Sequence, residues 1–382
     1  MSSLSAPMVA PPETESIPLA KPEIGAREEE LVQEVLRSGR LSLGPLGERF
    51  ERELAAWLGV EDAIAVSSGT TALHLGVRAL GWGPGDEVLT SPFSFVASAN
   101  CLLYEGARPV FCDVDPQTLN LDPAAVEAAG GGRSVGILPV HIFGFPAAMP
   151  ELEAIAARRG LGILEDACEA LGAIDADGRR VGSRGNLAAF AFYANKQLTT
   201  GEGGMIVPPS AEVAARLRSE RNQGRAPDMG WLDHGGLGFN YRLSDVAAAL
   251  GVAQVEKLDA MLARRDAVAS RYEEGLAGVE GVETLIAARG EEQRSWFVYA
   301  VRLAEEIDRD GVIARLGEAG VASKAYLPCI HLFPHLRELG WREGQFPVAE
   351  AASARSLALP FFPAMTESQV ARVCEALAEA LR

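Results

Sequence analysis

Short apolar runs alternate with longer amphipathic stretches between residues 63 and 207, and this alternation restricts the fold more than any other feature. The stretches at 97–104, 123–129 and 149–159 are typical of helices, since their apolar residues recur with a helical period. Strands that alternate with helices predict an α/β fold with a mostly parallel, doubly wound sheet. The expected strands cover 63–66, 87–90, 109–114, 135–140, 161–164 and a run that ends near Tyr193.

The rest of the chain predicts further helices and a second, smaller domain. About ten residues separate Tyr193 from the next apolar run at 205–207, too few for a helical crossover, so that pair is expected to be antiparallel. We expect a flexible N-terminal tail at 1–16, a large α/β domain at 17–250 and a small C-terminal α+β domain at 251–382. The expected helices are two within 28–58, one at 211–221 and a long one at 241–272, broken near Gly251. The small domain is expected to contain strands at 296–303 and 322–327 and helices at 310–318, 348–357 and 369–381.

Charge and hydropathy exclude several classes of partner. The net charge of −17, with no basic run, argues against binding to nucleic acid or to an anionic membrane surface. No apolar run approaches the roughly 20 residues that span a bilayer. Residues 1–15 carry no positive charge before an apolar block, so they do not resemble a secretory signal. We therefore expect a cytoplasmic globular protein.

Cysteine and histidine spacing predicts no metal site. The five cysteines are scattered without a C-x-x-C pair, which fits reduced core thiols better than disulfides or zinc ligands. His331 and His335 have helical spacing, but Pro334 lies between them and no glutamate follows His331.

Lys196 follows an apolar run, residues 188–193, and precedes a turn rich in threonine and glycine. Partial desolvation in such a place favours the neutral amine, which can attack a carbonyl carbon and form a Schiff base. The alternative is a solvated loop lysine without a chemical role.

The strand expected at 63–66 runs directly into Ser67-Ser-Gly-Thr-Thr. At a helix start this sequence offers free backbone N–H groups, a small gap at Gly69 and the hydroxyls of Thr70 and Thr71, which suit a phosphate. An ordinary serine or threonine N-cap explains the same residues without a ligand. Neither G-x-x-x-x-G-K-[ST] nor G-x-G-x-x-G follows a strand here, which argues against an ATPase and a dinucleotide enzyme.

Four separate signals fall at or just past the carboxyl ends of expected strands, where doubly wound sheets bind ligands. These are Gly69 with Thr70, Phe95, Asp166 and Lys196. Pyridoxal phosphate needs this set: a phosphate cradle, an aromatic ring to stack on the pyridine, an acid for the ring nitrogen and a lysine amine.

At these motifs the sequence resembles the nucleotide-sugar aminotransferases of the DegT/StrS group, which have the aspartate aminotransferase-like fold (fold type I). The resemblance runs from about Ile17 to the C-terminus. It is carried by Ser67-Ser-Gly-Thr-Thr-Ala-Leu, Pro139-Val-His-Ile-Phe-Gly144, Glu165-Asp-Ala-Cys-Glu-Ala170, Asn195-Lys-Gln-Leu-Thr-Thr-Gly-Glu-Gly-Gly204, Asn222-Gln-Gly-Arg225 and Gly238-Phe-Asn-Tyr-Arg-Leu-Ser-Asp245.

The resemblance implies roles for individual residues. Lys196 would be the Schiff-base lysine, Asp166 the pyridinium partner and Phe95 the stacking residue. Asn240 would reach the cofactor phosphate of a neighbouring subunit, which implies a homodimer with shared active sites. Glu169 stands where many members have a glutamine that bonds the ring oxygen, so Glu169 would have to be protonated or act through water.

The resemblance also suggests a substrate. Ala191 and Tyr193 stand where many members have serine and histidine, and the strings 192–196 and 325–332 are similar to perosamine-synthase-like members. This implies amination at C4 of a 4-keto-6-deoxy nucleotide sugar with L-glutamate as donor, in amino-sugar and polysaccharide biosynthesis.

Several alternatives remain open at this point. Tyr193, Arg225 and His331 either contact substrate or donor, or serve packing and surface ion pairs, while His141 and Trp296 are expected in the core. Competing functions are a dehydratase or a cyclitol aminotransferase on the same scaffold, and a non-catalytic regulator that keeps the fold. Dehydratases of the group carry histidine in place of the lysine, so Lys196 favours amino transfer.

Overall fold

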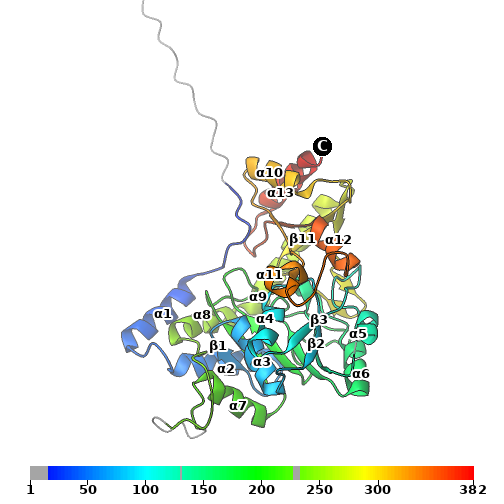
Figure 1. Cartoon of the computed structure of the whole chain (residues 1–382). Helices are drawn as coiled ribbons and strands as arrows, with labels where there is room; N and C mark the ends of the chain where they lie inside the picture. The colour runs from blue at the N-terminus through cyan, green and yellow to red at the C-terminus, as the bar shows by residue number, and fades with distance from the viewer. Residues whose placement is uncertain (1–15, 130, 227–232) are drawn as a thin grey trace, which may run out of the picture.

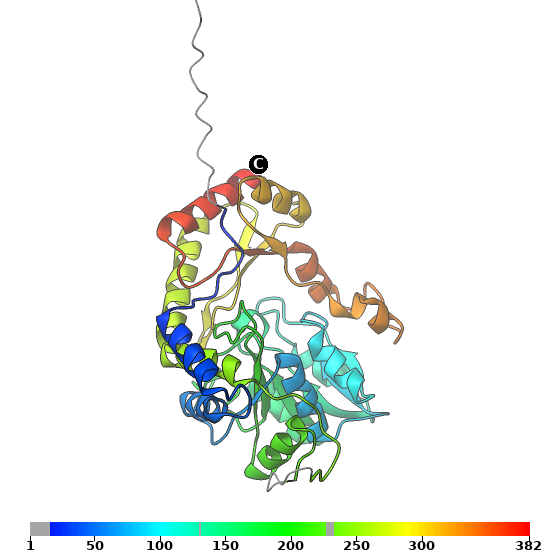
Figure 2. The same cartoon turned by 90° about the vertical axis from the view of Figure 1, so that its left-hand side faces the viewer.

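The structure is a computed structural model that describes residues 16–129, 131–226 and 233–382. In these ranges a large α/β body and a smaller body from the C-terminal part of the chain lie against each other (Figures 1 and 2). Residues 1–15 of the predicted tail lie outside the described residues. The domain boundaries given as 17–250 and 251–382 stay predictions. The backbone of Ile17, at the start of the first range, pairs with Val321 of the small body.

A seven-stranded sheet in the described residues forms the centre of the large body, in the order β1-β7-β6-β5-β4-β2-β3. Six strands of this sheet point the same way, and β7 runs in the opposite direction between β1 and β6. This confirms the predicted mostly parallel α/β sheet and the antiparallel strand. The strands are β1 (Ile64–Val66), β2 (Glu87–Thr90), β3 (Arg108–Phe111), β4 (Ser134–Leu138), β5 (Gly162–Asp166), β6 (Leu187–Ala191) and β7 (Gly204–Val207).

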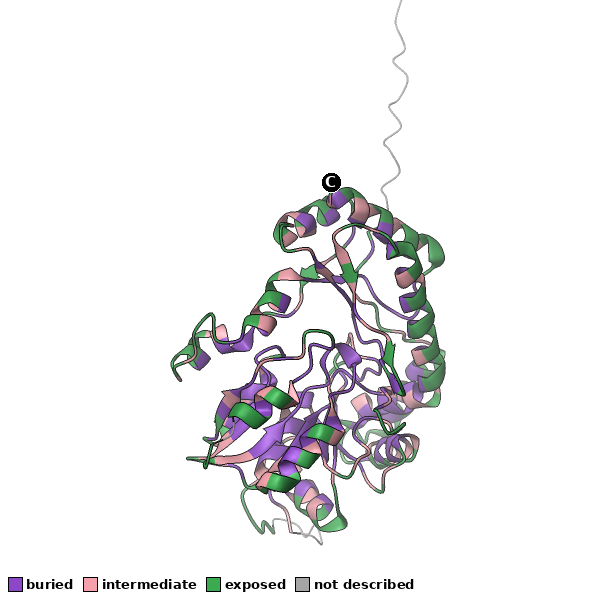
Figure 3. Ribbon diagram, turned by 90° about the vertical axis from the view of Figure 1, so that its right-hand side faces the viewer, coloured by how far each residue is buried: buried purple, intermediate pink, exposed green. Residues whose placement is uncertain are grey.

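Helices cover both faces of this sheet, because successive strand residues point to opposite sides. Ala188 and Phe190 of β6 share a core with Phe50 of α2, whereas Ala189 between them shares the other core with Leu73 of α3. Figure 3 shows the strands buried and the outer helix faces exposed. The helices are α1 (Ala26–Ser38), α2 (Pro45–Leu58), α3 (Gly69–Leu80), α4 (Ala97–Tyr104), α5 (Pro123–Ala129), α6 (Met149–Arg159), α7 (Ala211–Arg221) and α8 (Asp245–Glu256).

The small body is built on an antiparallel sheet in the order β12-β13-β11-β8. Its strands are β8 (Val282–Thr284), β11 (Tyr299–Leu303), β12 (Lys324–Ala325) and β13 (Ser356–Leu359), and a hairpin is formed by β9 (Ala288–Arg289) and β10 (Glu292–Gln293). Its helices are α9 (Leu258–Leu276), α10 (Arg309–Glu318), α11 (Pro334–Arg337), α12 (Pro347–Arg355) and α13 (Glu367–Ala380). Thr366 and Gln369 form a capping box at the start of α13.

Two expectations about the helices are wrong. The long helix expected at 241–272 is two helices, and they separate at Lys257 rather than near Gly251. Gly251 lies inside α8, where an added Cβ would approach the Phe50 ring to 2.7 Å, so the glycine lets α8 pack closely on α2. The helix expected at 348–357 ends at Arg355, because Ser356–Leu359 pairs as a buried strand between β11 and β12.

Gly251→Ala tests this packing argument. We expect the free energy of unfolding to fall by about 1–3 kcal/mol, since the new methyl group overpacks the contact with Phe50. Gly317→Ala in α10 is the matched control, because an added Cβ there meets no atom within 4 Å. Alanine in that helix should stabilise the protein by about 0.5–1 kcal/mol. Urea titrations of both variants check the prediction, which fails if Gly251→Ala is as stable as the wild type.

Candidate active site

A cavity of about 500 Å³ lies at the carboxyl edge of the large sheet. Its wall also includes two aromatic residues that precede and follow strands of the small body, Phe297 and Tyr326. Seven of the ten predicted site residues line it: Gly69, Thr70, Phe95, Asp166, Glu169, Tyr193 and Lys196. The structure therefore brings these seven together, because their strands end at one edge, while the role of each stays a prediction.

The start of α3 points its backbone at this cavity. Ser68 caps the helix: its Oγ accepts a hydrogen bond from the Thr71 N–H at 3.1 Å, and Thr71 Oγ1 accepts one from the Ser68 N–H at 3.0 Å. The N-cap interpretation thus holds for Ser68, while Gly69 and Thr70 line the cavity. A helix N-terminus carries partial positive charge, so this end of α3 suits a phosphate.

The gap expected beside Gly69 is filled by protein. A Cβ added there would lie 2.6 Å from the Cβ of Ala191 and 2.9 Å from the Sγ of Cys168. The glycine is therefore needed for the close approach of α3 to the end of β6, which the sequence alone did not reveal.

Asp166 is the last residue of β5, and each oxygen of its buried carboxylate accepts a hydrogen bond. The Ser98 hydroxyl donates to Oδ2 at 2.6 Å, and the Cys168 backbone N–H donates to Oδ1 at 3.1 Å. Ser98 Oγ also lies 2.7 Å from Ser94 Oγ. These hydrogen bonds hold both oxygens of the Asp166 side chain in place at the cavity.

Lys196 extends into the cavity from the loop after β6. Its Nζ lies 3.7 Å from Glu169 Oε1 and 3.9 Å from the centre of the Phe297 ring, and 13% of its side chain is exposed. The Lys196 carbonyl accepts a hydrogen bond from the buried Arg265 guanidinium at 3.1 Å. The alternative of a solvated loop lysine therefore does not describe the structure.

Glu169 is buried beside this amine. Its Oε2 accepts a hydrogen bond from the Phe143 backbone N–H at 2.9 Å. Burial raises the pKa of the Glu169 carboxyl above its usual range, against the opposing effect of the Lys196 charge.

Glu169→Gln should therefore change how stability depends on pH. Because the folded pKa is raised, the folded protein keeps a proton that the unfolded chain has lost. Wild-type stability should then fall, by up to about 1.4 kcal/mol per pH unit, as pH rises from the usual glutamate range through the folded pKa. Glutamine has no such titration, so the variant should be the more stable protein above this window and approach the wild type at acidic pH. Urea titrations at several pH values measure the effect. Glu202→Gln is the control: it changes an exposed residue at the same cavity, and its stability should depend on pH as that of the wild type does.

The sequence interpretation missed several residues of the site. Ser98 was not predicted, although its spacing of four from Ser94 at the start of a helix is a usable signal. Phe297 and Tyr326 could not be found, because they come from the small body and reach the cavity only through domain packing.

Among the predicted aromatic residues, Phe95 and Tyr193 are 62% and 52% exposed, so both rings are available to a ligand.

Three predicted residues do not line the cavity. Asn240 is exposed and its backbone pairs with Asn222, and Arg225 pairs with His234. His331 is fully buried with its Nε2 3.2 Å from Glu350 Oε1, and burial lowers the pKa of its imidazole. Its position therefore agrees with the packing alternative. The expected burial of His141 and Trp296 is also found.

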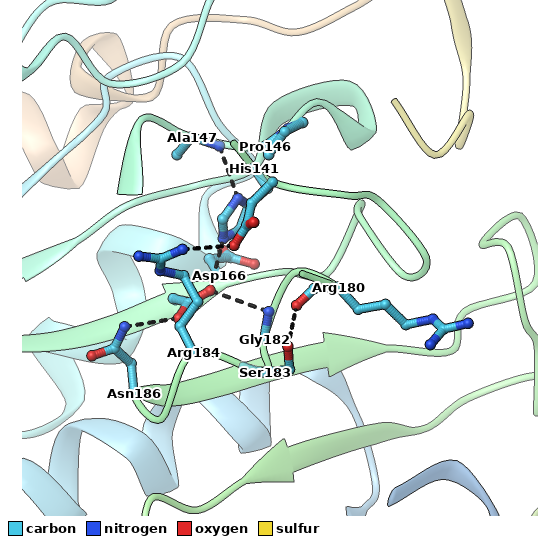
Figure 4. A network of polar contacts seen from close by, with 12 residues as sticks. His141, Pro146, Ala147, Asp166, Arg180, Gly182, Ser183, Arg184 and Asn186 are labelled. Atoms are coloured by element: carbon cyan, nitrogen blue, oxygen red, sulfur yellow. Dashed lines mark hydrogen bonds and ion pairs between the residues drawn. The ribbon is translucent and has the colours of Figure 1, made fainter. Parts of the chain in front are cut away.

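His141 belongs to a buried network behind the site, which Figure 4 shows. Its Nδ1 accepts a hydrogen bond from the Ala147 N–H at 2.9 Å, and its Nε2 lies 3.2 Å from Glu165 Oε2. The Asn186 amide donates to the other Glu165 oxygen at 3.0 Å. Since neighbouring strand residues alternate in direction, this network holds Glu165 on one face of β5 while Asp166 faces the cavity.

The described ranges lack two kinds of feature. No helix within them is long and apolar enough to cross a membrane. No group of three or more histidine, cysteine, aspartate or glutamate side chains in the same ranges is placed to hold a metal ion.

The sequence was compared with family models, and residues 22–378 match the DegT/DnrJ/EryC1/StrS aminotransferase family. The chain belongs to this family. It is 36% identical over 380 residues to the spore coat polysaccharide biosynthesis protein SpsC of Bacillus subtilis, covering 96% of this chain and 97% of that protein. It is 38% identical over 371 residues to GDP-perosamine synthase of Caulobacter vibrioides, and the match covers 96% of this chain and 98% of that protein. A pleiotropic regulatory protein of Geobacillus stearothermophilus is 38% identical over 354 residues, covering 92% and 94%.

Solved structures give the same result for the fold. DesV of S. venezuelae superposes with a TM-score of 0.91 at 36% sequence identity, covering 97% of this chain and all of that one. Spr1654 of Streptococcus pneumoniae, solved in a PLP-form, superposes with a TM-score of 0.90 at 26% identity, covering 96% and 98%. The aspartate aminotransferase-like fold predicted for this family member is thereby confirmed.

The residues in the cavity fit pyridoxal phosphate. They supply a helix N-terminus for the phosphate, an exposed aromatic ring, a carboxylate and an amine. In addition, the Asn195 Oδ1 on the cavity wall is buried and, among the described residues, has no hydrogen-bond partner. A buried acceptor of this kind is suited to a ligand donor.

Proposed function

We propose that this aminotransferase family member is a pyridoxal phosphate-dependent enzyme that moves an amino group from L-glutamate to a keto nucleotide sugar, at C4 of a 4-keto-6-deoxyhexose. The observation that carries the proposal is the convergence of the Lys196 amine and the Asp166 carboxylate on one cavity beside the N-terminus of α3. When bound, the cofactor supplies an aldehyde carbon and a ring that accepts electrons.

The protein residues would divide the work as follows. The backbone at Gly69 and Thr70 binds the phosphate, and Phe95 stacks on the ring. Asp166, oriented by Ser98, keeps the ring nitrogen protonated. Lys196 would hold the cofactor through its amine and, once released, would act as the base that moves the proton between carbons.

The names of the relatives support the substrate class. GDP-perosamine synthase is 38% identical to this chain over nearly its full length, which favours a nucleotide sugar and amination at C4. SpsC is assigned to spore coat polysaccharide biosynthesis, which favours an amino sugar for a polysaccharide. The regulator alternative has one observation in its favour, the similarity to the pleiotropic regulatory protein.

The visible absorbance of the purified protein before and after L-glutamate tests the proposal. A cofactor band that glutamate bleaches establishes the first half of the reaction, with L-aspartate and L-glutamine as comparison donors. Nucleotide-linked 3-keto and 4-keto sugars are then offered, and the carbon that gains nitrogen is identified by NMR. A protein that binds the cofactor but responds to no donor would favour the regulator.

We further propose that Asn240 completes the site of a second copy in a homodimer, since it is exposed and lies outside its own cavity. Subunit mixing tests this. Lys196→Ala and Asn240→Ala subunits should each be inactive alone, but a mixed dimer contains one site in which both residues are intact. Random mixing should therefore restore about a quarter of the wild-type activity. If mixing restores nothing, although hybrid dimers form, the shared site is rejected.

A further inference from the structure

Glu169 and Lys196 face each other in the cavity with little access to solvent. Glu169 Oε1 lies 3.7 Å from Lys196 Nζ, and the side chains are 7% and 13% exposed. We propose that this pair shares one proton, and that Glu169 takes it from the Lys196 ammonium so that a neutral amine is available to the cofactor aldehyde. The inference rests on the proposed function, because it concerns the amine that binds pyridoxal phosphate.

The Glu169 carboxyl is held so that one oxygen remains directed at the amine. Oε2 accepts the hydrogen bond from the Phe143 N–H at 2.9 Å, which leaves Oε1 as the atom nearest to Nζ. A separation of 3.7 Å exceeds a direct hydrogen bond, but proton-transfer pairs often lie this far apart before the ligand is bound. A small rotation of either side chain, or one bridging water, completes the path.

The backbone that holds this carboxyl is strained. Phe143 has φ +51° and ψ +24°, a left-handed conformation that a bulky residue rarely adopts. Its carbonyl accepts a hydrogen bond from the buried Arg294 guanidinium at 2.8 Å. Such strain persists only where the surroundings enforce it, and here it directs the Phe143 N–H at Glu169.

The groups around Glu169 allow both positions of the proton. Asp166 on one side disfavours a second negative charge on Glu169, whereas the Lys196 ammonium favours it. Arg294, Tyr326 and the Cys168 thiol also interact electrostatically with Glu169. With the proton on Lys196 both groups are charged, and with the proton on Glu169 both are neutral. Burial disfavours the charged pair, whereas the attraction between the two charges favours it, so these two effects oppose each other.

The step balances without any other reactant. One N–H bond of the Lys196 ammonium breaks and one O–H bond forms at Glu169 Oε1, with no change of oxidation state. The same transfer converts Glu169 from an acceptor into a hydrogen-bond donor. It thereby removes the difficulty that a carboxylate stands where many family members have the donor amide of glutamine.

The rate at which cofactor-free full-length protein captures pyridoxal phosphate tests the pair. Capture is followed by the absorbance of the bound cofactor across a pH series for the wild type and Glu169→Gln. In the wild type the singly protonated pair contains a fixed fraction of neutral amine, so capture should be independent of pH between its two titrations. In Glu169→Gln the neutral amine should decline about tenfold per pH unit below its titration. The capture rate of the wild type divided by that of Glu169→Gln should therefore rise about tenfold for each pH unit by which the pH falls.

Controls separate this inference from the proposed function. Titrations of the cofactor itself are common to both proteins and cancel in the ratio. Glu202→Gln removes a carboxyl group from the cavity wall without touching the pair, and should follow the wild type. A rate ratio that stays constant across the pH series overturns the shared proton, with cofactor capture intact. A wild-type protein that captures no cofactor at all overturns the proposed function instead.

Discussion

Replacing Lys196 with alanine is expected to lower kcat for amino transfer by at least about 10³-fold and to abolish the visible band of bound cofactor. Among the described residues that line the cavity, Lys196 carries the one amine, so nothing there can replace it. Steady-state kinetics and absorbance spectra of the purified variant measure both effects. Circular dichroism of the variant checks that the loss is not caused by unfolding.

Two further variants define the cause of this loss. Lys196→Arg keeps a positive charge beside Glu169, but a guanidinium does not lose its proton in proteins, so it should be as inactive as the alanine variant. Lys21→Ala changes an exposed lysine outside the cavity and should retain activity. Substantial glutamate-dependent turnover in Lys196→Ala would contradict the assignment of this lysine.

Asp166→Asn is expected to reduce kcat by about 10²–10³-fold. Asparagine has nearly the same shape, so the change tests the charge rather than the packing. The Ser98 hydroxyl and the Cys168 N–H now hold a carboxylate whose negative charge would keep the ring nitrogen protonated. The neutral amide cannot do this, and electron withdrawal by the ring should weaken. Single-turnover kinetics with glutamate measure the affected step.

Ser98→Ala is a milder change at the same carboxylate, and its activity is compared with that of Asp166→Asn. It removes one hydrogen bond to Asp166 and leaves the charge, so a loss of about tenfold is expected. The order wild type, Ser98→Ala, Asp166→Asn is the expected ranking. Activity of Asp166→Asn above that of Ser98→Ala would show that the charge of Asp166 is not what the reaction needs.

Most of the large sheet could be predicted, because its signal is local. Strands that are buried on both faces appear in the sequence as short apolar runs, and Ala188 and Ala189 of one such run lie in opposite cores. The convergence of Gly69, Phe95, Asp166 and Lys196 follows from strand direction alone.

Features that depend on a distant partner were missed or misassigned. Ser356–Leu359 is a strand because β11 and β12 lie beside it, not because of its own pattern. Gly251 serves the contact with Phe50, about two hundred positions earlier in the chain, so the sequence could not distinguish it from a helix break.

The sequence by itself determined the fold class, the family and the residues that end at one edge of the sheet, because periodicity and short motifs act over a few neighbouring residues. Only the tertiary structure decided which of them form the cavity and which atoms they meet. It brought Phe297 and Tyr326 to the cavity wall, and it buried His331 beside Glu350, outside the cavity. It also set the 3.7 Å between Lys196 and Glu169. Such distances arise from packing between segments far apart in the chain, where a change of one ångström alters the chemistry and leaves no trace in local sequence pattern.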